Sequence, residues 1–207
     1  GAIFFQGADG KRTRYDLGGL KIRGAHNLEN LMAAICVGHI CGCPAEVLQK
    51  VIDEFPGLEH RLEWVGNVDG VSFFNDSKGT NVGSVVKSLM SFQKPILLIA
   101  GGKDKGGDYS PLKELITKRV KGMVLIGEAK ERIWNALGGL TETVKKSTLE
   151  EAVQWAFSKA CPGDVILLSP ACSSFDMFDN YQERGKRFRA IVHGLAEKEY
   201  SSRQGEK

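Results

Sequence analysis

Residues 95–108 read PILLIAGGKDKGGD, in which an apolar run ends in a glycine-rich polar loop. Residues 165–174, VILLSPACSS, repeat this arrangement with a loop of small and hydroxyl residues. Continuous apolar runs of this length are typical of strands buried on both faces, as in a parallel sheet. The two stretches therefore predict an α/β fold in which polar residues directly follow buried strands.

Strand and helix patterns alternate from about residue 56 onward, which is the order expected for a parallel sheet with right-handed crossovers. We expect six strands, at residues 62–68, 71–75, 95–100, 123–126, 142–145 and 165–168. The dipeptide Asp69-Gly70 is a strong hairpin signal, so the first strand should be antiparallel to the second. The predicted fold is a Rossmann-like, mostly parallel six-stranded sheet with one antiparallel strand and helices on both faces.

The chain up to residue 57 has a different pattern, with strand candidates at 2–5, 13–17 and 20–23 and helix candidates at 27–40 and 44–55. So few short elements make a poor domain, and we interpret this part as an incomplete remnant of a second α/β domain. The 27–40 helix should therefore expose an apolar face. The expected organisation is a remnant over 1–57, a Rossmann-like domain over 58–200 and a flexible tail over 201–207.

The composition narrows the class of protein. The 207 residues are 42% hydrophobic and carry a net charge of +3, which is typical of a globular chain. No apolar run approaches the roughly 20 residues that cross a bilayer, and no concentrated basic stripe points to nucleic acid. Five cysteines without a disulfide spacing indicate a reducing, cytosolic environment. Cys36, His39, Cys41 and Cys43 match no standard zinc pattern, so we expect buried small residues there and no metal site.

Polar loops follow three of the predicted strands, at residues 76–81, 101–108 and 169–174. The carboxyl ends of parallel strands meet at one edge of a sheet, where open α/β sheets bind ligands. Lys78 and Lys105 would supply charge there, and Thr80 and Ser174 would supply hydroxyl groups. Two lysines on different loops suit a ligand with two separated negative groups, although either lysine alone is better explained as a solvated turn residue.

The chain has no Gly-x-x-x-x-Gly-Lys-[Ser/Thr] motif, so it does not encode a complete phosphate-transfer site. Arg61 follows His60 near the boundary between the two parts. Its guanidinium could contact a phosphate or cap a helix, and the spacing leaves both open. The residues alone therefore leave room for a non-catalytic module that binds an anion or a nucleotide.

Three motifs resemble those of the Mur ligases: Asn-Asp-Ser-Lys-Gly-Thr-Asn at 75–81, Gly-Gly-x-x-Lys at 101–105 and Ser-Pro-Ala-Cys-Ser-Ser at 169–174. Gly-Ala-His-Asn at 24–27 and His-Arg at 60–61 fit the same family in the expected order. The family has a UDP-binding domain, a central ATPase domain and a C-terminal Rossmann-like domain. The resemblance, over about residues 24–195, implies that this chain holds the end of the second domain and all of the third.

The first of these motifs is the specific one, and it resembles the branch of the family that adds D-glutamate. That resemblance implies a cytoplasmic, monomeric peptidoglycan-precursor ligase without membrane or nucleic-acid partners. ATP would activate UDP-N-acetylmuramoyl-L-alanine as an acyl phosphate, and D-glutamate would attack it. The family also uses Mg²⁺, whose ligands would lie mostly outside this chain, so the chain alone is expected to be inactive. A ligase like folylpolyglutamate synthase, which also adds glutamate, is the rival enzyme.

The same resemblance implies roles for individual residues. Lys78, Thr80 and Lys105 would hold the side-chain carboxylate of D-glutamate. Ser174 and the backbone near Tyr181 would hold its α-carboxylate.

Other matched residues would contact ATP. Asn27 and Asn30 would meet the adenine, and Arg61 and Asp76, together with Lys78, would meet phosphate or ribose. Lys78 and Arg61 are the expected catalytic residues.

Overall fold

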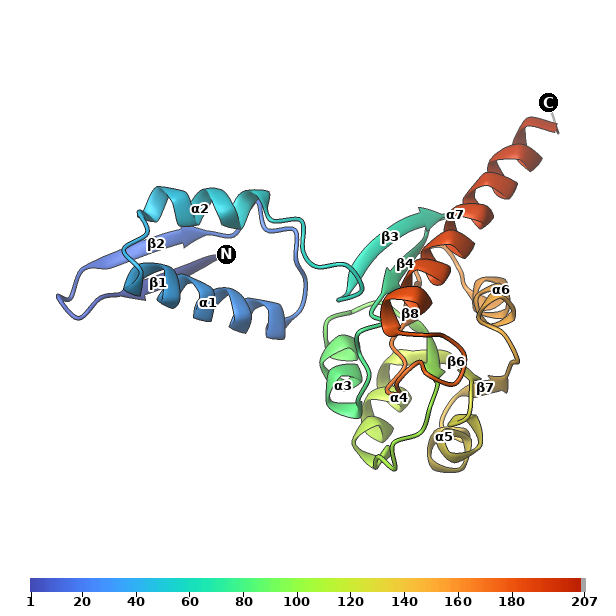
Figure 1. Cartoon of the computed structure of the whole chain (residues 1–207). Helices are drawn as coiled ribbons and strands as arrows, with labels where there is room; N and C mark the ends of the chain where they lie inside the picture. The colour runs from blue at the N-terminus through green and yellow to red at the C-terminus, as the bar shows by residue number, and fades with distance from the viewer. Residues whose placement is uncertain (206–207) are drawn as a thin grey trace. The chain divides into compact units, whose positions relative to one another are not determined.

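The computed structural model describes residues 1–205, and the side chains of residues 1–197. The chain divides into two compact units, Gly1–Leu58 and Glu59–Lys207 (Figure 1). The side chains of the expected tail over 201–207 lie outside the described residues.

The first unit pairs a hairpin with two helices. Strands β1 (Ala2–Gln6) and β2 (Arg12–Asp16) are antiparallel, and helices α1 (Ala25–Ile40) and α2 (Ala45–Glu54) follow. A small core of Tyr15, Ile35 and Ile52 holds these elements together. The strand predicted at 20–23 is wrong, because this stretch runs without a partner strand while Leu20 packs on the core.

Helix α1 exposes apolar side chains, as expected for the 27–40 helix. Met32 is 42% exposed, Val37 59% and Ile40 84%. Isolated apolar residues on a surface are normal, but several on one helix indicate a face that another surface can cover.

The second unit is built on one six-stranded sheet, as predicted. Its strands are β3 (Glu63–Val68), β4 (Val71–Asn75), β5 (Ile96–Gly101), β6 (Val120–Ile126), β7 (Glu142–Lys145) and β8 (Val165–Leu168). Their spatial order is β3-β4-β8-β5-β6-β7, with only β3 antiparallel to its neighbour. Asp69 and Gly70 both have positive φ, at 50° and 80°, which is the conformation a tight hairpin requires.

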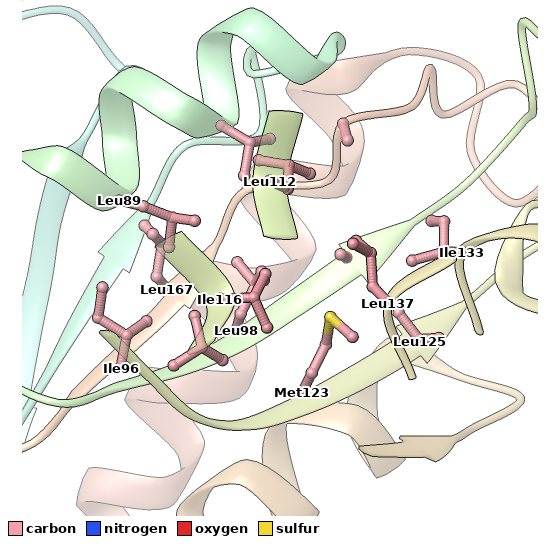
Figure 2. Close-up of a cluster of buried hydrophobic side chains, with 14 of the residues drawn as sticks. Leu89, Ile96, Leu98, Leu112, Ile116, Met123, Leu125, Ile133, Leu137 and Leu167 are labelled. Atoms are coloured by element: carbon pink, nitrogen blue, oxygen red, sulfur yellow. The ribbon is translucent and has the colours of Figure 1, made fainter. Parts of the chain in front are cut away.

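Helices cover both faces of this sheet. One face carries α3 (Val82–Met90), η1 (Ser110–Leu112), α4 (Lys113–Arg119) and α5 (Lys130–Leu137), and the other carries α6 (Leu149–Lys159) and α7 (Tyr181–Gly205). Alternate residues of β5 point to opposite sides, so that Ile96 and Leu98 enter one core and Leu97 and Ile99 enter the other. Figure 2 shows part of the first core, with Leu98 among its neighbours.

Strands β5 and β8 mark a change of direction in the sheet. They are hydrogen-bonded neighbours, yet the chain leaves β5 for η1 and α4 on one face and leaves β8 for α7 on the other. A crevice opens outside the carboxyl ends of the strands at such a switch point, and ligands bind there in open α/β sheets.

Candidate functional site

The three polar loops predicted to carry the site follow β4, β8 and β5, which are adjacent in the sheet. The loop after β8 lies between the other two. Its Ala171 donates a backbone hydrogen bond to the carbonyl of Gly79 at 2.9 Å, and the carbonyl of Ser173 accepts one from Lys103 at 2.9 Å. The expectation that the loops share one edge of the sheet is confirmed.

The predicted anion-binding side chains lie on these loops. Lys78 and Lys105 are exposed, Thr80 is half-buried and Ser174 is 2% exposed. The Nζ of Lys78 lies 5.9 Å from the ring centre of Tyr181, the first residue of α7. Both ammonium groups are therefore open to solvent, and their contact with an anion stays a prediction.

Asp76 turns its carboxylate into the protein. Its Oδ2 accepts hydrogen bonds from Ser88 and Ser169, both at 2.7 Å, and its Oδ1 accepts one from the backbone N–H of Leu62 at 3.3 Å. Burial raises the pKa of this carboxyl, while the nearby charge of Arg61 acts in the opposite direction. The structure therefore gives Asp76 a role in joining three segments, and its contact with phosphate or ribose stays a prediction.

His60 anchors the segment that carries Arg61. Its ring is buried, its Nδ1 lies 2.9 Å from the side-chain nitrogen of Asn75, and its carbonyl accepts a hydrogen bond from the N–H of Lys78 at 3.0 Å. Gly185 of α7 fits closely against the ring, since a Cβ there would lie 2.2 Å from Nδ1. Arg61 itself is half-buried next to this anchor.

The glycine-rich loop after β5 is braced by a residue that sequence reasoning missed. Arg132 of α5 donates to the Oδ2 of Asp104 at 2.8 Å and to the carbonyl of Gly107 at 2.9 Å. The hydrogen bond from Arg132 to the Asp104 carboxylate is the largest cause that lowers the pKa of Asp104. Lys105 therefore projects from a loop fixed on both sides of it.

A second missed residue, Arg184, lies in the first turn of α7 and is only 1% exposed. Arginine is rarely buried, so composition and periodicity gave no reason to place it inside. The adjacent Gly185 was the available signal, because a glycine inside a helix commonly marks a face that packs closely.

Cys172 packs in the core of the second unit and does not have the surroundings of a reactive nucleophile. Its Sγ is 3.2 Å from the hydroxyl of Tyr109, and burial raises the pKa of its thiol. A thiol held in its neutral form is a poor nucleophile.

The expected adenine contacts lie in the first unit. Asn27 is 7% exposed and donates from its side chain to the carbonyl of Arg23 at 2.7 Å. Asn30 is exposed on the same helix, three residues later, where the two side chains share a face. Their contact with adenine stays a prediction.

The expectation that the cysteines at 36–43 are buried is wrong, because Cys36 and Cys41 are exposed and Cys43 is half-buried. The described residues contain no group of three or more His, Cys, Asp or Glu side chains that could hold a metal ion. Within the same residues, no helix is both long and apolar enough to cross a membrane.

The family model and the curated relatives that match this chain point to the same family. A family model described as "Mur ligase, glutamate ligase domain" matches residues 60–172. A relative from Geotalea daltonii, named UDP-N-acetylmuramoylalanine--D-glutamate ligase, is 54% identical over 187 residues, which are 90% of this chain and 41% of the relative. The chain thus spans about two fifths of the length of the curated relatives it matches.

Solved structures share the fold at low sequence identity. A pseudomurein peptide ligase type C from Methanothermus fervidus has a TM-score of 0.67 at 16% identity, over 90% of this chain and 39% of that one. The folylpolyglutamate synthase of Mycobacterium tuberculosis has a TM-score of 0.63 at 14% identity, over 84% of this chain and 42% of its own. At these identities the likeness concerns the fold alone, so it does not separate the two kinds of ligase.

Proposed function

The chain belongs to the Mur ligase family, and on that premise we propose that it is the amino-acid-binding part of a ligase that joins D-glutamate to UDP-N-acetylmuramoyl-L-alanine at the expense of ATP. The observation that carries the proposal is the 54% identity, over 90% of this chain, to a relative named for that activity. The arrangement of the three loops agrees with it, because D-glutamate has two carboxylates and the edge offers cations on two of the loops.

The reaction proceeds in two steps. The γ-phosphoryl group of ATP passes to a carboxylate oxygen of UDP-N-acetylmuramoyl-L-alanine, which gives an acyl phosphate and ADP. The amine of D-glutamate then attacks the acyl carbon, loses a proton and displaces phosphate through a tetrahedral intermediate. The contribution of this chain is to hold the amine in line with the acyl carbon, which is catalysis by positioning.

Different loops would bind the two carboxylates of the amino acid. Lys78, Thr80 and Lys105 hold the side-chain carboxylate, and Ser174 holds the α-carboxylate together with the backbone near Tyr181. Each charge-assisted hydrogen bond contributes about 1.5–3 kcal/mol when the pair is partly desolvated.

We propose that Asn27 and Asn30 of the first unit contact the adenine of ATP. Arg61 and Asp76 of the second unit, with Lys78, would contact its phosphate or ribose. We propose that the Mg²⁺ of the family is held mostly by residues outside this chain, because no group of three or more His, Cys, Asp or Glu side chains among the described residues could hold a metal ion. We further propose that the complete protein is a monomer in the cytoplasm.

A phosphate-release assay on the complete protein tests the proposal. We expect release with ATP only when both UDP-N-acetylmuramoyl-L-alanine and D-glutamate are present, and little with L-glutamate. A folate acceptor in place of the UDP-sugar tests the rival ligase. Release with the folate, or no release under any combination, would contradict the proposal, and the second result would favour a non-catalytic binding module.

A further inference from the structure

The guanidinium of Arg184 lies between two of the loops at the carboxyl edge of the sheet. It donates to Ser77 twice, from Nε to Oγ at 3.0 Å and from Nη2 to the carbonyl oxygen at 2.9 Å. On its other side, Nη2 donates to the carbonyl of Cys172 at 3.2 Å and Nη1 to that of Ser173 at 3.3 Å. One side chain therefore connects the loop after β4 to the loop after β8.

Both ends of this connection adjoin residues of the proposed site. Ser77 precedes Lys78, which would hold the side-chain carboxylate, and Ser173 precedes Ser174, which would hold the α-carboxylate. The guanidinium is a rigid planar fork, so bonds to both loops fix their separation more tightly than a flexible ammonium could. The distance between the two carboxylate positions thus depends on Arg184.

Among the described residues, no carboxylate accepts a hydrogen bond from the guanidinium of Arg184. All four of its acceptors are uncharged oxygens, and Asp76 and Asp176 act on it only through space. Burying a charge without a charged partner is costly, and well-packed apolar groups often serve stability equally well. A buried guanidinium here also adds positive potential to the edge of the sheet that would receive a dicarboxylate. This combination points to a role beyond packing.

We propose that Arg184 is a positioning residue that sets the spacing of the two carboxylate positions, and so selects D-glutamate over D-aspartate, which is one methylene shorter. The inference rests on the proposed function, because it takes the loops on either side as the two ends of the amino-acid site.

Steady-state kinetics of Arg184→Lys in the complete protein provide the test, with D-glutamate, D-aspartate and ATP varied separately. The lysine keeps the charge but loses the fork. We expect the KM for D-glutamate to rise roughly ten- to hundredfold, the size associated with losing hydrogen bonds to a charged group. The KM for ATP should change less than about threefold, and the preference for D-glutamate over D-aspartate should fall about tenfold.

Arg187→Lys is the matched control. Arg187 lies one turn further along α7, is exposed and pairs with Glu150 rather than with either loop. Its replacement should leave the KM values for D-glutamate and ATP unchanged.

Ser77→Ala is a milder variant for the case that replacing the buried arginine prevents folding. It removes the Oγ that accepts from Arg184 and donates to the carbonyl of Tyr181 at 2.8 Å. It should shift the KM for D-glutamate and the preference over D-aspartate in the same direction, by a smaller factor.

Folded variants that kept the wild-type preference between the two amino acids, or that lost only kcat, would overturn the inference. A wild-type protein that released no phosphate with D-glutamate would instead refute the proposed function beneath it.

Discussion

Ser169 donates a hydrogen bond from its Oγ to the Oδ2 of Asp76 across 2.7 Å, which joins the loop after β8 to the loop after β4. Ser88 of α3 donates to the same oxygen at 2.7 Å. Asp76 is only 4% exposed, so these hydroxyl groups replace the water that its carboxylate lost on folding. The edge of the sheet that would receive the ligand is held in shape by this buried carboxylate.

Replacing Ser169 by alanine should lower the free energy of unfolding by about 1–3 kcal/mol, because the buried carboxylate of Asp76 loses one of its donors. Urea unfolding followed by tryptophan fluorescence measures the change. All three tryptophans of the chain lie in the second unit, so the signal reports on that unit. Ser158→Ala is the control, since the Oγ of Ser158 bonds an exposed helix carbonyl, and it should stay within about 0.5 kcal/mol of wild type. Equal effects of the two variants would contradict the role given to Ser169.

Gly101 and Gly163 allow a comparison of two glycines with similar backbones. Both have positive φ, at 112° and 100°, so alanine should strain either one by about 1–2 kcal/mol. Only at Gly101 would the new Cβ also collide with the protein, 2.0 Å from the carbonyl oxygen of Ile126, whereas nothing lies within 4 Å at Gly163. Gly101→Ala should therefore lose about 1–3 kcal/mol more stability than Gly163→Ala. Thermal unfolding of both variants would measure the difference. A smaller loss of stability in Gly101→Ala than in Gly163→Ala would contradict the predicted collision between Gly101 and β6.

His60 should make the stability of the second unit depend on pH. Burial, the largest cause, lowers its pKa from the ordinary value of 6.5, and Arg189 and Lys186 act in the same direction while Glu59 and Glu63 oppose it. The folded state therefore binds the proton less tightly than the unfolded state. The stability that His60 contributes is fully present above about pH 6.5 and is lost as the pH falls through the lowered pKa.

Replacing His60 by asparagine tests this prediction, because asparagine tolerates the positive φ of 65° at this position. Between about pH 7.5 and about pH 5, the wild type should lose more of its free energy of unfolding than His60→Asn. The difference between the two curves isolates His60 from the acidic residues that both proteins share. Parallel curves over this range would contradict the prediction.

The two lysines of the proposed site should differ in their effects on kinetics. Lys105→Ala should raise the KM for D-glutamate by roughly one to two powers of ten, with less change for ATP, since its loop follows β5 and serves the amino acid. Lys78→Ala should also lower kcat, because Lys78 lies beside Asp76, where we propose that nucleotide and amino acid meet.

Lys103→Ala, an exposed lysine of the same glycine-rich loop, is the control and should leave the KM for D-glutamate close to wild type. If Lys105→Ala left the KM for D-glutamate unchanged, the prediction would be wrong. Both lysines would then be ordinary solvated turn residues.

The sheet could be predicted from the sequence because its central strands are buried on both faces. Ile96–Gly101 and Val165–Leu168 are fully buried, so their side chains had to be apolar throughout, and the alternation with helices then required parallel pairing. The prediction of a strand at 20–23 was wrong, because its pattern fits more than one local structure. Residues 20–23 read Leu-Lys-Ile-Arg, an alternation of apolar and charged side chains that is typical of a strand, but Leu20 packs on the core without any strand beside it.

The positions of the loops could be predicted, but the roles of the polar side chains within them could not. Nothing in the spacing distinguishes Asp76, whose carboxylate is buried, from Lys78, which is exposed two residues later. The residues that brace the loops come from distant parts of the chain: Arg132 from α5 and Arg184 from α7. Such contacts depend on the packing of helices against the sheet, which local sequence does not specify.

A crystal structure of the complete protein with ADP and D-glutamate would test the central claim most directly. The account predicts the amino acid at the carboxyl ends of β4, β5 and β8, with its side-chain carboxylate at Lys78, Thr80 and Lys105 and its α-carboxylate at Ser174. D-glutamate bound away from these loops, or bound there with both carboxylates remote from the two lysines, would contradict it.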